Sequence, residues 1–139
     1  MAEEEPISKL DVARLSLTGI AMGLLTALVG LPPAIEPWLW LVIYVAWIAL
    51  VVRYRVARPF WTIVLGSVAT GVLASVIQVA LFWQYRANNP WIADELKGTG
   101  RTGYLASFLW QGILAGAVFG IVAGALAARL RAILDARRR

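Results

Sequence analysis

Few side chains in this 139-residue chain could carry out chemistry. Histidine and cysteine are both absent, which excludes disulfides, thiolate or imidazole metal sites, histidine-ligated haem and nucleophilic catalysis that pairs Ser or Cys with His. We therefore expect no enzyme activity, no metal site and no cofactor. All carboxylates lie outside the long apolar segments defined below: Glu3, Glu4, Glu5, Asp11, Glu36, Asp94, Glu95 and Asp135.

The polar side chains inside the apolar segments are mainly Gln78, Gln111 and Ser107. An amide in lipid needs a hydrogen-bond partner, and bonds of this kind between membrane helices contribute about 0.6 kcal/mol on average. One interpretation is a polar clasp, in which the two glutamines of adjacent helices meet. The alternative is that these side chains line a narrow polar path.

Small residues recur at a spacing of four, which places them on one face of a helix. Such a face lets a second backbone approach closely, and in lipid it acts as a packing device. The partner could be another helix of the same chain or a helix of a neighbouring chain. The residues concerned are Gly112, Gly116, Gly120 and Gly124, then Gly19 and Gly23, then Ser67, Gly71 and Ser75.

The elements that position these residues follow from hydropathy. The chain is 60% hydrophobic with a mean hydropathy of +0.73, and a soluble domain of this size could not bury so much apolar surface. A helix needs about 20 mostly apolar residues to cross a hydrocarbon core of about 30 Å. We therefore predict an all-α fold, an integral membrane four-helix bundle forming a single domain over residues 1–139. Its predicted spans are about 12–31, 37–53, 60–84 and 103–128.

The connections also show helix signals. Ser8 and Asp11 have the spacing of a capping box that would begin the first helix. Residues 85–102 form the one long connection, and we predict a short interfacial helix within it. Asn89 would cap this helix, Pro90 would occupy its first turn and Gly98 would end it.

The basic residues indicate orientation, since Lys and Arg accumulate on the cytoplasmic side. Ten lie at the termini or in the second connection: Lys9, Arg14, Arg53, Arg55, Arg58, Arg129, Arg131, Arg137, Arg138 and Arg139. The opposite side has three: Arg86, Lys97 and Arg101. This bias predicts a multi-pass protein of the bacterial cytoplasmic (inner) membrane with both termini cytoplasmic. Because the basic residues border apolar segments, we expect them to contact anionic lipid and not nucleic acid.

The arrangement resembles a family of small bacterial four-helix membrane proteins of unknown function. The resemblance rests on Gly66 and Gly71 in the third span, on Tyr85 with Asn89-Pro90 at the start of the long connection, and on a glycine-bearing last helix. It covers about the second half of the chain. It implies a shared architecture and supplies no activity.

Three functional hypotheses follow. The first is a non-catalytic accessory subunit that forms a homo-oligomer, or docks into a larger membrane assembly, through its glycine and small-residue helix faces. The alternative is a small oligomeric channel or uniporter with a polar path lined by Gln and Ser, since passive conduction needs no charged residue. The third, an enzyme acting on lipid, would depend on Asp94, Glu95 and Arg101 in one loop.

Overall fold

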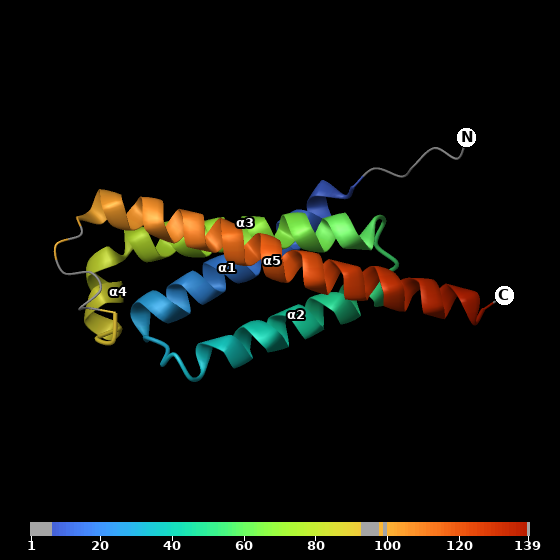
Figure 1. The fold of residues 1–139 in the computed structure, drawn as a ribbon, viewed down its shortest axis with the longest axis horizontal. Helices are drawn as coiled ribbons and strands as arrows, with labels where there is room; N and C mark the ends of the chain where they lie inside the picture. Colours follow the sequence, from blue (N-terminus) through green and yellow to red (C-terminus); the bar gives the residue numbers. More distant parts are fainter. Residues whose placement is uncertain (1–6, 93–97, 99, 139) are drawn as a thin grey trace.

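The computed structural model describes residues 7–92, 98 and 100–138, and these residues form five helices and no strand (Figure 1). Four of the helices are long and apolar enough to cross a membrane, which confirms the prediction of an all-helical chain with four helices of membrane length. A short helix comes between the third and fourth of these long helices in sequence. The helices are α1 (Lys9–Leu28), α2 (Glu36–Arg53), α3 (Pro59–Ala80), α4 (Phe82–Asn88) and α5 (Arg101–Ala136).

Helix α3 lies at the centre of the fold. It packs against α1 on one side and against α5 on the other, whereas α2 contacts chiefly α5 (Figure 1). In the most apolar stretch of α3, 44% of the residues are buried within the chain, against 11% in α2. The second span therefore lies at the periphery, with most of its large side chains facing outward.

Local signals explain the starts of α1, α2 and α3 and the end of α1. The Ser8 hydroxyl accepts a hydrogen bond from the Asp11 backbone N–H at 3.2 Å, so the predicted cap of the first helix is present. Proline occupies the first turns of α2 and α3, where no backbone donor is needed. Gly30, just after α1, has a φ of 77°, a conformation that glycine adopts without a steric penalty.

The structure differs from the sequence prediction around the long connection. The third long helix ends at Ala80 and not at 84, and a short helix that was not predicted, α4, precedes Asn89. Pro90–Ile92 form a turn, and residues 93–97, where most of the expected helix fell, lie outside the described residues. The Asn89 amide nitrogen donates to carbonyl groups earlier in the chain, as described below.

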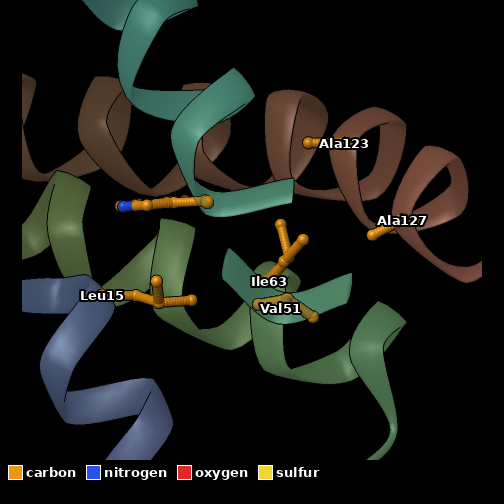
Figure 2. Packing of buried hydrophobic residues seen from close by; sticks show 6 residues of the cluster. Leu15, Val51, Ile63, Ala123 and Ala127 are labelled. Carbon is orange, nitrogen blue, oxygen red and sulfur yellow. The ribbon is translucent and has the colours of Figure 1, made fainter. Parts of the chain in front are cut away.

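A hydrophobic cluster joins α2 to the other helices near the end of the molecule that holds the start of α1 and the end of α5 (Figures 1 and 2). In Figure 2, Val51 and Ile63 lie together beside Ala127, while Leu15 approaches from α1. Because alanine occupies the α5 side of the contact, the larger side chains of α2 and α3 can lie close to the α5 backbone. The buried members are Leu15, Trp47, Val51, Ile63, Ala123 and Ala127.

Candidate functional site

The glycine series of α5 lies against α3 of the same chain. A Cβ atom added to Gly112 would lie 2.6 Å from the Gly71 carbonyl oxygen, and one added to Gly116 would lie 2.7 Å from that of Ser67. At Gly124 the Phe60 carbonyl oxygen would be 2.8 Å away. Real Cβ atoms do not tolerate such distances, so the two backbones are in contact only because these side chains are absent.

Gly120 continues the same contact, since its added Cβ would lie 2.9 Å from the Ser67 Cβ. The two glycines of α1 pack against a different face of α3. A Cβ on Gly23 would lie 2.8 Å from the Ile77 Cβ, and one on Gly19 would clash with the Thr70 carbonyl oxygen. All six glycines that the sequence singled out on α1 and α5 therefore face α3 within one chain.

The small-residue stripe of α3 faces its neighbours too. Ser75 Oγ lies 2.8 Å from both the Gly71 and the Phe108 carbonyl oxygens, so one hydroxyl spans the α3–α5 contact. Ser67 Oγ forms a hydrogen bond with the Tyr44 hydroxyl of α2. Ser67 thus contacts both neighbours, α5 through its backbone and Cβ and α2 through its hydroxyl.

The two glutamines have different partners. The buried Gln78 amide donates to the Thr26 hydroxyl of α1 at 2.8 Å, and that hydroxyl is 2.9 Å from the Met22 carbonyl oxygen. Gln111 is exposed on α5 and donates to Ser107 Oγ, one turn earlier on the same helix, at 3.3 Å. A polar clasp is therefore present between α3 and α1, but it pairs Gln78 with Thr26 and not with Gln111.

Ser107 and Gln111 belong to the side of α5 that points away from α3. At 100° per residue this side lies opposite the glycine series. We call it the outer face of α5, and its other members are apolar and exposed. Those members are Trp110, Leu114, Val118 and Val122.

Two asparagine amides at the end of α4 donate hydrogen bonds to the last carbonyl groups of α1. Asn88 Nδ2 donates to the Ala27 and Leu28 carbonyl oxygens at 3.0 and 2.9 Å, and Asn89 Nδ2 donates to that of Thr26 at 2.8 Å. Helix C-termini leave such carbonyls without partners, so these bonds tie α4 to α1. Asn89, one of the residues on which the resemblance described above rests, here has a structural role.

Arg101 performs the same task for α3. Its Nε donates to the Val79 carbonyl oxygen at 3.2 Å, and its Nη2 lies 3.4 Å from that of Ala80. This role was not predicted, because nothing in the local sequence around Arg101 indicates which helix end its side chain reaches. The lipid-enzyme hypothesis instead grouped Arg101 with Asp94 and Glu95, and those two residues lie outside the described part of the chain.

Within the described residues, no three His, Cys, Asp or Glu side chains are grouped so that they could hold a metal ion. The polar groups at membrane depth are instead distributed over the α1–α3 contact, the α3–α5 contact and the outer face of α5. Comparison with known protein families, with characterised proteins and with solved structures gave no match.

Proposed function

We propose that this chain is a non-catalytic membrane protein that assembles laterally with another transmembrane helix through the outer face of α5. The partner helix belongs to a second copy or to another subunit of a membrane complex. One observation carries the proposal: an exposed amide, Gln111, with the Ser107 hydroxyl beside it, lies on a face that is otherwise apolar.

The depth of Gln111 makes its exposure significant. Arg101 begins α5 and reaches the end of α3, so both helices end at about the same level. Gln111 lies ten residues further along α5, which is about 15 Å at 1.5 Å per residue. This is close to the middle of a hydrocarbon core of about 30 Å. A polar side chain at this depth is stabilised by a hydrogen bond to another helix.

The glycine faces do not supply the docking surface in this proposal, because α3 already covers them within the chain. The assembly therefore depends on a face with a glutamine, a serine and several large apolar side chains. Hydrogen bonds across such a contact set the register of the two helices, and dispersion between the apolar side chains adds to the affinity.

The proposed orientation places both termini in the bacterial cytoplasm, within the cytoplasmic membrane. The start of α1, the α2–α3 connection and the end of α5 lie at the same end of the molecule (Figure 1). This brings nearly all of the predicted cytoplasmic Lys and Arg residues to one side, as the positive-inside rule requires. Of the basic residues counted in the sequence, Lys97 and Arg139 lie outside the described residues.

Cysteine cross-linking tests the docking face directly, since the chain has no cysteine of its own. Ser107→Cys places a single thiol on the outer face of α5. Mild oxidation in native membranes should join two copies if the partner is a second copy, giving a band at twice the 15.2 kDa chain mass. Val42→Cys is the matched control, because Val42 is exposed on α2 and outside the proposed face.

If the partner is another protein, Gln111→Leu should reduce the amount that co-purifies in fixed ratio under mild extraction. Gln78→Leu is the control, because its amide bonds within the chain. Native mass spectrometry of the released protein distinguishes the cases. A lone 15.2 kDa chain for wild type, with no cross-link at Ser107→Cys, would contradict the proposal.

The channel hypothesis leads to a different expectation. Its polar path needed Gln78, Gln111, Ser75 and Ser107 together, but one chain distributes them over three separate surfaces. A path would therefore have to form between chains, around Gln111. In that case Gln111→Leu would change ion or solute flux in proteoliposomes, whereas under the proposal it changes only the size of the assembly.

A further inference from the structure

A pocket of about 330 Å³ lies between the end of α2 and the last turns of α5. Its polar lining is strongly basic, with four arginines against one carboxylate. The arginines come from two parts of the chain that are about 80 residues apart in sequence, as the Arg55–Asp135 contact shows. The polar lining residues are Arg53, Arg55, Arg131, Arg138 and Asp135.

Asp135 holds two of the arginines in place. Its carboxylate accepts from Arg55 Nη2 at 3.2 Å and from Arg131 Nε at 3.0 Å. This ties the α2–α3 connection to α5 and leaves an excess of positive charge in the lining. Arg131 Nη1 is buried and has no hydrogen-bond acceptor within the described residues. Arg53 and Arg138 also line the pocket and are in neither of these ion pairs, so Asp135 does not occupy their guanidinium donors.

The backbone at Arg55 is also unusual. Its φ is 53°, a left-handed conformation that non-glycine residues seldom adopt and that glycine adopts easily. Arg58, three residues later, has a similar φ of 48°, and of the two only Arg55 lines the pocket, where its side chain reaches Asp135.

We propose that this pocket binds the phosphate group of an anionic phospholipid. Guanidinium groups bind phosphate through paired N–H donors, and several of them converge on one cavity here. The volume lies at the lower end of the range for small-ligand sites, which suits a lipid headgroup. The inference does not depend on the outer face of α5, because the residues of that face precede the pocket residues Arg131 to Arg138 in the sequence.

A lipid is favoured over a free phosphate because apolar groups adjoin the arginines. Val52 and Leu134 form part of the pocket wall. Leu130 and Ile133, on the same last turns of α5, are 45% and 43% exposed. These apolar side chains lie beyond the uninterrupted apolar segment of α5. The glycerol and acyl portions of a bound lipid would cover them. A soluble anion would leave them in water.

The test uses the full-length protein and matched double variants. Arg53→Gln with Arg138→Gln removes two lining charges that no ion pair described above involves. Arg129→Gln with Arg137→Gln removes the same charge from exposed positions outside the pocket, one on α5 and one directly after it. The probes are short-chain phosphatidylglycerol, short-chain phosphatidylcholine and inorganic phosphate. Each is titrated against the detergent-solubilised protein, with native mass spectrometry counting bound lipids and thermal unfolding reporting stabilisation.

Wild type and the control pair should retain one phosphatidylglycerol, and the pocket pair should bind it at least about tenfold more weakly. Arg53→Lys with Arg138→Lys should restore most of the affinity, which separates lost charge from lost folding. Equal weakening in both glutamine pairs would overturn the proposal, because surface charge alone would then explain binding. Inorganic phosphate that binds as tightly as phosphatidylglycerol would assign a soluble anion and overturn the lipid source.

Discussion

Helices α3 and α2 are both apolar and of membrane length, yet they join the fold in opposite ways. Helix α3 contacts two neighbours through glycine, serine and threonine, and much of it is buried. Helix α2 carries large side chains almost throughout, and only Trp47 and Val51 are buried. Hydrophobicity alone does not decide how much of a helix is buried, since the most apolar stretch of α1, with a mean hydropathy of 1.3, is 39% buried, whereas that of α5, at 2.0, is 28% buried.

This difference between α3 and α2 indicates what stabilises helix–helix packing in lipid. Lipid tails are as apolar as leucine, so a large apolar side chain gains little by leaving them. A glycine face gains more, because it allows two backbones to approach and to form many dispersion contacts. Helix α2 instead attaches at discrete points, by Trp47 in the hydrophobic cluster and by the Tyr44–Ser67 hydrogen bond.

The largest expected effect comes from filling the α3–α5 contact. In Gly71→Leu the new side chain would meet the Gly112 carbonyl oxygen, and the helices would have to separate. We expect the free energy of unfolding to fall by more than about 3 kcal/mol, with Gly71→Ala intermediate. The measurement is reversible unfolding in mixed micelles followed by far-ultraviolet circular dichroism.

Gly100→Ala is the control for that series. Gly100 precedes α5, and an added Cβ there would have no heavy atom within 4 Å. Its cost should stay below about 1 kcal/mol, the range for a poorer residue at a helix start. If Gly71→Leu unfolds no more easily than Gly100→Ala, then close backbone contact does not hold α3 in place.

A medium effect is expected at the attachment of α2. Trp47 is 2% exposed, whereas Trp38 on the same helix is 67% exposed. Trp47→Ala should destabilise the fold by about 2 kcal/mol, less than in a soluble core because lipid replaces part of the lost contact. Trp38→Ala should change the free energy of unfolding by less than about 0.5 kcal/mol. Equal effects of the two changes would show that α2 is not held through Trp47.

The smallest expected effect is at the polar clasp between α3 and α1. Gln78→Leu removes the bond to Thr26, while the Thr26 hydroxyl keeps its contact with Met22. The loss should be about 0.6 kcal/mol, the average for such bonds in a membrane protein. Gln111→Leu should leave the stability of the single chain unchanged. A larger loss at Gln111 than at Gln78 would mean that the exposed amide belongs to the fold.

Parts of the site were predictable from sequence, and other parts were not. The spacing of Gly112, Gly116, Gly120 and Gly124 indicated one packing face on a helix, and that face is in contact along its length. The spacing did not indicate the partner. The two glutamines looked equivalent in sequence, since each follows a serine at helical spacing in an apolar segment. Only the rotation of α3 and α5 about their axes makes Gln78 buried and Gln111 exposed.

The ends of the helices show the same division. Ser8 caps α1 through a bond that spans three residues, so a local pattern was sufficient. Asn89 had an equally good local pattern for starting a helix. Most residues of that helix lie outside the described part of the chain, but the Asn89 amide nitrogen donates to the Thr26 carbonyl oxygen, 63 positions earlier. No local pattern indicates this bond, because its acceptor is a carbonyl group at the end of another helix.

By itself, the sequence determined the helical class, the four apolar segments, the absence of histidine and cysteine chemistry and the positions of the small residues. These depend on composition and on periodicity along one helix. The tertiary structure decided which helix fills each glycine face, which glutamine faces outward and which arginines share a pocket with Asp135. Those outcomes depend on contacts between segments far apart in the chain, whose relative rotation and depth no local pattern encodes.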